Sequence, residues 1–200
     1  MVHPTKPRSS RSLATSLPNL LTYARIAAVP ALVACFFVEG DSGKWAAVVI
    51  FTLAGFTDFL DGYLARIWQQ QSSLGQMLDP IADKLLVASA LMILVANGTL
   101  SGWTLWAAII ILCREILVSG LRESLAELKV SVPVTRLAKW KTAVQMVALG
   151  ILLASPAGDK LIPGVTEFGL ACLWISAILT LYTGFDYFRA SIGHLFDDEL

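Results

Sequence analysis

Six long apolar stretches constrain the fold of this chain more than any other feature. A membrane-spanning helix needs about 20 mostly apolar residues. The stretches cover residues 20–38, 45–65, 81–96, 103–121, 142–154 and 168–187. The chain is 56% hydrophobic and only 15% charged, which is too apolar for a soluble globular domain of 200 residues. We therefore expect an all-α integral membrane protein with six transmembrane helices.

The charged residues between these stretches predict their orientation. Lys and Arg precede the first stretch and gather again between the fourth and fifth, whereas the opposite loops carry only Lys44 and Lys160. Because cytoplasmic loops are enriched in Lys and Arg, we expect both termini and the basic loop to be cytoplasmic. Residues 1–15 are then a polar cytoplasmic tail, 16–190 the membrane domain, and 191–200 a short acidic cytoplasmic tail. The 15 Lys and Arg only balance the 15 Asp and Glu, so no nucleic-acid partner is indicated.

Two pairs of aspartates lie near one predicted membrane face. Asp58 and Asp61 are one helical turn apart in TDFLDGYLAR, and Asp79 and Asp83 are four residues apart in LGQMLDPIADK. We expect a loop over 67–78, after which Asp79 is the N-cap of the third helix and the proline that follows it takes the first helical position. The four carboxylates would then converge at one depth.

Such a group of carboxylates favours a divalent metal site. Like charges this close repel one another unless a cation lies among them, and hard cations such as Mg²⁺ or Mn²⁺ prefer oxygen ligands. The alternative is that the aspartates cap helices and pair with Arg66 and Lys84 at the membrane interface.

The spacing of these residues resembles the signature of the CDP-alcohol phosphotransferases. The pattern is DxxDGxxAR, eight residues, then GxxxDxxxD, and it is carried here by Asp58, Asp61, Gly62, Ala65, Arg66, Gly75, Asp79 and Asp83. The resemblance implies a core of six membrane helices with a site open to the cytoplasm. It also implies an enzyme that uses CDP-diacylglycerol as a substrate.

The resemblance further implies roles for individual residues. Two metal ions are expected, one held by Asp58, Asp61 and Asp79 and the other by Asp58, Asp79 and Asp83. The last of these, Asp83, matches the proposed general base, which takes the proton of the acceptor hydroxyl. Contacts to the CDP-lipid are expected from Asn19, Thr22, Gly62, Ala65, Arg66, Ser72 and Gly75.

A second polar cluster bears on the acceptor. Arg114 interrupts an apolar run, and it would face hydrocarbon unless it points into a polar cavity. Several cations near a metal site suit an acceptor that carries a phosphate. The segments CREILVSGLRE and LAKWKTAVQ also resemble those with which some members of the family bind glycerol 3-phosphate. The residues expected to bind it are Arg114, Arg122, Lys139 and Lys141.

These observations predict transfer of a phosphatidyl group from CDP-diacylglycerol to sn-glycerol 3-phosphate in phospholipid biosynthesis. Alternatives are another acceptor, such as inositol phosphate, and, outside the family, a divalent-cation transporter. The basic residues of the second cluster, apart from Arg114, could also be ordinary anchors at headgroup level. We expect a bacterial inner membrane, surrounding lipids and a homodimer. The small side chains of Ala27, Ala28, Ala31 and Ala34 could pack two copies together or pack within one.

Overall fold

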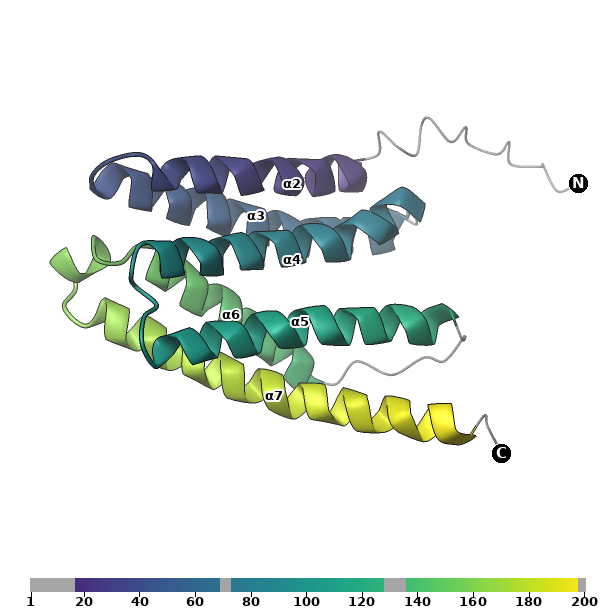
Figure 1. The fold of residues 1–200 in the computed structure, drawn as a ribbon. Helices are drawn as coiled ribbons and strands as arrows, with labels where there is room; N and C mark the ends of the chain where they lie inside the picture. The colour runs from purple at the N-terminus through teal and green to yellow at the C-terminus, as the bar shows by residue number, and fades with distance from the viewer. Residues whose placement is uncertain (1–16, 69–72, 128–135, 198–200) are drawn as a thin grey trace, which may run out of the picture.

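The computed structural model describes residues 17–68, 73–127 and 136–197 of the chain, and every long element in these ranges is an α-helix (Figure 1). The helices are α2 (Leu17–Phe36), α3 (Asp41–Trp68), α4 (Ser73–Ala96), α5 (Thr104–Glu127), α6 (Arg136–Leu153) and α7 (Val165–Asp197), and a short 3₁₀ turn, η1 (Gly158–Lys160), precedes α7. Each predicted apolar stretch therefore lies largely within one of these helices.

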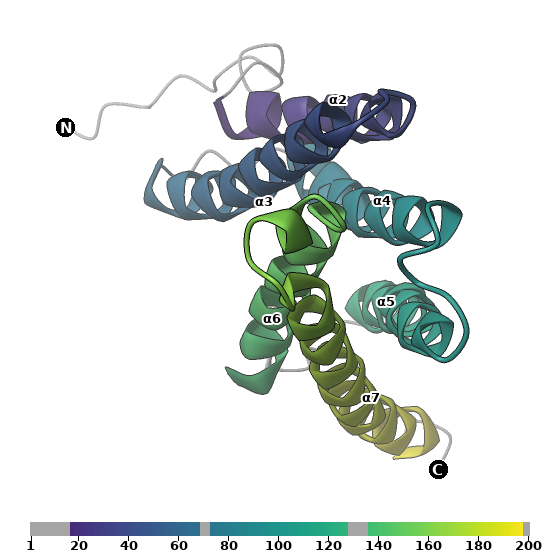
Figure 2. The same ribbon diagram turned by 90° about the vertical axis from the view of Figure 1, so that its left-hand side faces the viewer.

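The helices form two groups of three that lie side by side. α2 packs against α3 and α4, and α7 packs against α5 and α6. Contacts of α3 with α6 and of α4 with α5 and α6 join the groups, as Figures 1 and 2 show. The prediction of an all-α architecture is confirmed for the described residues.

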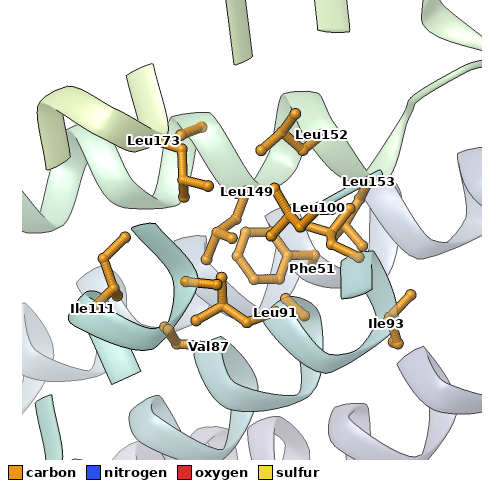
Figure 3. Close-up of a cluster of buried hydrophobic side chains, with 14 of the residues drawn as sticks. Phe51, Val87, Leu91, Ile93, Leu100, Ile111, Leu149, Leu152, Leu153 and Leu173 are labelled. Carbon is orange, nitrogen blue, oxygen red and sulfur yellow. The ribbon is translucent and has the colours of Figure 1, made fainter. Parts of the chain in front are cut away.

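The centre of the bundle is filled by aliphatic side chains around one aromatic ring. Phe51 of α3 lies among Leu91 of α4 and Leu149 of α6, and all three are nearly inaccessible (Figure 3). The outward faces are also apolar: Phe56, Trp106 and Ile178, for example, are largely exposed. Apolar side chains both inside and outside a helical bundle are typical of a protein surrounded by lipid.

Three helices are long and apolar enough to cross a membrane, judged by length and composition within the described residues. The segments are Asn19–Phe36, Thr104–Leu125 and Val165–Arg189, and Trp140–Leu153 is a shorter apolar helix. The membrane character predicted from composition is thus supported. The exact number of spans and the cytoplasmic position of both termini stay predictions.

The predicted start of the third helix is wrong. α3 continues to Trp68 and α4 already begins at Ser73, so residues 67–68 and 73–78 of the expected loop are helical. Pro80 lies inside α4 rather than at its first position. A proline within a helix removes one backbone donor and crowds the preceding turn, and the packing of α4 against α2 compensates for this cost. Asp79 uses its carboxylate for a contact with α2 and not as a cap.

The bounds of the helices bear on the predicted ends of the membrane domain. α7 runs through Asp197, so residues 191–197 of the segment expected as an acidic cytoplasmic tail are helical, and the cytoplasmic position of this segment stays a prediction. The expected tail over 1–15 lies outside the described residues. α6 begins at Arg136, which places Lys139 and Lys141 in its first turns.

Candidate active site

One face of α2 contacts carboxylates of α3 and α4, the two helices that carry the predicted metal ligands. Arg25 Nη1 lies 2.6 Å from Oδ1 of Asp58 on α3. One turn earlier on α2, the Thr22 hydroxyl donates to Oδ1 of Asp79 on α4 at 2.5 Å. Both α2 side chains are buried. Because residues three apart share a face of a helix, α2 fixes Asp58 and Asp79 beside each other.

Asp58 lies near two other predicted metal ligands, Asp79 on one side and Asp83 on the other, and the three residues form an acidic cluster. The negative charges of Asp58 and Asp79 lie close enough to repel each other, and so do those of Asp58 and Asp83. Asp61 belongs to α3, but its side chain lies outside the described set. Among the described side chains alone, no three metal-ligating groups lie close enough to hold an ion.

The residues predicted to contact the CDP-lipid fall into two groups. Three of them are buried, namely Asn19 and Thr22 on α2 and Gly75 on α4. Thr22 also contacts Asp79 of the acidic cluster. The backbone of Gly62, Ala65 and Arg66 lies in α3, but nothing is described of their side chains, and Ser72 lies outside the described residues. Their role in binding stays a prediction.

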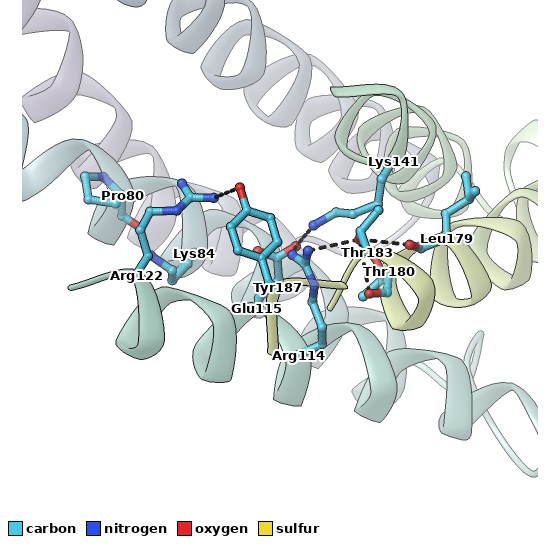
Figure 4. Close-up of polar contacts among 10 residues, drawn as sticks. All are labelled: Pro80, Lys84, Arg114, Glu115, Arg122, Lys141, Leu179, Thr180, Thr183 and Tyr187. Atoms are coloured by element: carbon cyan, nitrogen blue, oxygen red, sulfur yellow. Dashed lines mark hydrogen bonds and ion pairs between the residues drawn. The ribbon is translucent and has the colours of Figure 1, made fainter. Parts of the chain in front are cut away.

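The second polar cluster joins α5, α6 and α7 (Figure 4). Arg114 Nη2 donates to the Thr183 hydroxyl at 3.0 Å, and Arg114 Nη1 lies 3.6 Å from Glu115 Oε1. Lys141, which is only 3% exposed, forms an ion pair with the same Glu115 oxygen. Arg114 therefore points into the bundle, as the cost of a charge in hydrocarbon requires.

Helix α7 makes room for the Arg114 side chain. A Cβ at Gly184 would lie 3.0 Å from Arg114 Cγ, so only a glycine permits this approach without a shift. One turn beyond Gly184 on α7, the Tyr187 hydroxyl lies 3.5 Å from Arg122 Nη2, and the Arg122 guanidinium carbon is 5.5 Å from the Tyr187 ring centre. The structure thus gathers Arg114, Lys141 and, at the edge, Arg122. These residues, together with Glu115, form the cationic cluster. The Lys139 side chain lies outside the described set.

A cavity of about 440 Å³ lies between α4 and α5. Its polar wall includes Asp83 of the acidic cluster and Glu115 of the cationic cluster, and Ile81 and Leu112 belong to its apolar wall. The two polar clusters, which are far apart in the sequence, therefore meet at one cavity. Arg114 and Lys141 do not line the cavity themselves, and they are connected to it through Glu115.

Sequence comparison decides which kind of protein carries this arrangement. The sequence model described as CDP-alcohol phosphatidyltransferase matches residues 15–182, which include the acidic cluster and the charged residues Arg114, Glu115 and Lys141. The chain belongs to the CDP-alcohol phosphatidyltransferase family. The resemblance inferred from the spacing of the aspartates is thereby confirmed.

Bacterial members of the family are similar to this chain over nearly their whole length. A protein of Rickettsia bellii is 46% identical over 175 residues, which cover 88% of this chain and 94% of the relative. One from Cereibacter sphaeroides is 38% identical over 92% of this chain and 99% of its own length. One from Haemophilus influenzae is 38% identical over 92% of this chain and 97% of its own. All three are named CDP-diacylglycerol–glycerol-3-phosphate 3-phosphatidyltransferase.

Two charged residues of this phosphatidyltransferase site were not among the predicted site residues. Arg25 interrupts the first apolar stretch just as Arg114 interrupts the fourth, so the cost of a charge within a span could have identified it. Glu115 was visible as a polar residue beside Arg114. Its pairing with Lys141 was not predictable, because the two residues are 26 positions apart on different helices.

Proposed function

We propose that the protein transfers the phosphatidyl group of CDP-diacylglycerol to sn-glycerol 3-phosphate, giving phosphatidylglycerophosphate and CMP. The names of its relatives, at 38–46% identity over nearly full length, support this reaction. The structural observation that carries it is the buried pair of cations, Arg114 and Lys141, which contact Glu115 at the cavity that Asp83 also lines. An acceptor with a phosphate and a free hydroxyl suits that arrangement.

The acidic cluster fits divalent cations by its donor chemistry. Carboxylate oxygens are the ligands that Mg²⁺ and Mn²⁺ prefer, and bound cations would relieve the repulsion among the crowded aspartates. Asp58, Asp61 and Asp79 would hold one ion. Asp58, Asp79 and Asp83 would hold a second, and their side chains would have to draw closer together around it than they lie in the structure. When bound, the ions supply charge neutralisation at the pyrophosphate and at the departing CMP.

The residues of the chain then divide the work of the transfer. Asp83 accepts the proton of the acceptor hydroxyl while the hydroxyl oxygen attacks the phosphorus that bears the diacylglycerol. The bond from that phosphorus to the bridging oxygen breaks, and CMP leaves with the electron pair. Arg66, in the matched CDP-binding signature, contacts the lipid pyrophosphate through its two-pronged guanidinium.

The cationic cluster positions the acceptor. Arg114 and Lys141 bind the phosphate of glycerol 3-phosphate, and Arg122 and Lys139 add positive charge at the edge. Because Glu115 already neutralises part of this charge, a phosphate must compete with a carboxylate for the two buried cations. An acceptor with no negative charge could not make that exchange, which favours a phosphorylated alcohol.

The surroundings of the enzyme follow from the same residues. The bacterial relatives and the loop charges support an integral protein of a bacterial inner membrane with its site facing the cytoplasm. A homodimer is also part of the proposal. It is supported by the exposed small side chains of Ala27, Ala31 and Ala34 on α2, which would allow two helices to approach closely.

An acceptor comparison tests the reaction. The purified protein, with CDP-diacylglycerol and Mg²⁺ or Mn²⁺, is given glycerol 3-phosphate, inositol phosphate or serine, and CMP release is measured. We expect CMP only when both the lipid and glycerol 3-phosphate are present, and little after chelation of the metal. A preference for inositol phosphate would reassign the acceptor within the family. Metal flux into proteoliposomes without any CMP release would instead support a cation transporter.

A further inference from the structure

Arg25 lies beside the acidic cluster, although the proposed reaction makes no use of it. Its side chain is 0% exposed, and Nη1 lies 2.6 Å from Asp58 Oδ1. Its charge also acts on Asp83 of α4. A buried guanidinium in an apolar helix is costly, and it persists only where partners compensate for the lost hydration.

The position of Arg25 excludes two ordinary roles for a basic residue in a membrane helix. An arginine that anchors a helix extends to the headgroups and stays partly exposed, whereas this one is fully buried. It also lies apart from the cations of α5 and α6 that the proposed function assigns to the acceptor. Its charge is directed toward the carboxylates of α3 and α4.

The charges of the cluster define what Arg25 contributes. Asp58 repels Asp79 and Asp83, so bringing these side chains together is unfavourable without a cation. Arg25 supplies that cation from within the chain, and Thr22 on the same face of α2 holds Asp79. A divalent cation bound by the same carboxylates would provide the same compensation, but it would also be repelled by the guanidinium.

We propose that Arg25 is the resident counter-ion of the acidic cluster and the positioning residue for Asp58. It keeps the carboxylates together before a divalent cation binds, and its positive charge sets an upper limit on how tightly that cation is held. The inference rests on the proposed metal-dependent function. It makes Arg25 responsible for two opposite effects, stability of the metal-free protein and weaker binding of the metal.

The two effects can be separated in Arg25→Gln. The full-length protein in detergent micelles is unfolded thermally in EDTA and in saturating Mn²⁺, and the Kd for Mn²⁺ is measured from the electron paramagnetic resonance signal of the free ion. In EDTA we expect a lower unfolding midpoint than in the wild type, and Mn²⁺ should restore most of the loss. Removal of one positive charge from the cluster should tighten Mn²⁺ binding at least about tenfold.

Lys160→Gln is the matched control, because it also removes a cation paired with an aspartate. Lys160 Nζ lies 2.5 Å from Asp41 Oδ2 at the start of α3, roughly 25 Å along the helix from Asp58. Its Kd for Mn²⁺ should equal that of the wild type. A guanidinium that only packed the helices together would lower the midpoint of Arg25→Gln equally in EDTA and in Mn²⁺ and leave the Kd unchanged, and that result would overturn the proposal.

The remaining outcomes are also decisive. If the wild type itself binds no Mn²⁺, the metal site of the proposed function fails and the inference fails with it. If the wild type binds Mn²⁺ and Arg25→Gln binds it no more tightly, only the inference fails. Should Arg25→Gln not be recovered folded in EDTA, it should be recovered when Mn²⁺ is present throughout, and no recovery would contradict the proposal. Arg25→Lys keeps the charge, so its Kd should stay within about threefold of the wild type.

Discussion

Lys141 of α6 and Glu115 of α5 form a buried ion pair at the junction of the two polar clusters. Arg114 Nη1 lies 3.6 Å from the same Glu115 oxygen. One carboxylate is therefore shared by two cations, and the three side chains together carry a single positive charge. This arrangement holds a lysine in place inside the bundle and leaves the site attractive to a phosphate.

Loss of Lys141 should impair use of the acceptor. In Lys141→Gln, Glu115 keeps only the more distant contact with Arg114, and the phosphate loses one cation. We expect kcat/KM for glycerol 3-phosphate to fall roughly 10- to 100-fold, as for loss of a charged hydrogen bond, with little change in the KM for CDP-diacylglycerol. Steady-state CMP release with each substrate varied in turn measures both values. Lys160→Gln is the control, and equal damage to both KM values would contradict the assignment.

Loss of the Asp83 carboxylate should stop the transfer itself. Asn keeps the size of the side chain but cannot accept a proton, so turnover of Asp83→Asn should fall by about 10²–10⁴-fold, the usual contribution of a general base. Binding of CDP-diacylglycerol should be largely retained, because the three other aspartates remain. Single-turnover CMP release and equilibrium binding of the lipid separate the two quantities. Full activity in this variant would remove Asp83 from the proposed role.

The helices were predictable because each reflects a local property of the sequence. An apolar segment that crosses a bilayer is helical because a helix satisfies its own backbone hydrogen bonds, and the six predicted stretches correspond to α2 through α7. The start of α4 was not predictable in this way. Asp79 followed by Pro80 is a strong local signal for a helix start, but packing against α2 extends the helix several residues earlier.

The site, like the fold, was predictable where it depends on local sequence spacing and not where it depends on contacts between distant segments. The spacing of Asp58, Asp79 and Asp83 within two short motifs predicted that they would come together. The structure places Asp58 near Asp79 and near Asp83, and their joint role as metal ligands stays a prediction. Contacts between distant segments could not be predicted from any local sequence pattern. Thr22 and Asp79 are 57 positions apart, so no sequence window contains both. The partners of the carboxylates on α2 therefore emerged only from the fold.

The close approach of α7 to Arg114 gives a further prediction. A methyl group at Gly184 would contact Arg114 Cγ at 3.0 Å and push the guanidinium away from Thr183. In Gly184→Ala we expect the KM for glycerol 3-phosphate to rise about threefold to tenfold, as for a weakened charged hydrogen bond. Gly150→Ala is the matched control in α6, where the nearest atom is 4.0 Å away. It should leave the KM unchanged, and an equal rise in both variants would exclude Arg114 as the cause.

Asp159 gives a prediction for stability without an effect on catalysis, because it lies in the turn before α7. Its carboxylate accepts hydrogen bonds from the Thr166 backbone N–H at 3.0 Å and from the Thr166 hydroxyl, and these bonds hold the pKa of Asp159 below its usual value of 3.8. A carboxylate with a lowered pKa in the folded state stabilises the protein above its unfolded pKa, and this contribution is lost as the pH falls through the folded value.

The unfolding midpoint of the wild type should therefore fall more steeply below about pH 4 than that of Asp159→Asn, which lacks the titrating group. At neutral pH the variant should unfold at a lower temperature than the wild type and should retain full CMP release. Thermal unfolding between pH 3 and 7 makes the comparison, and parallel curves for the two proteins would show that Asp159 does not stabilise the start of α7.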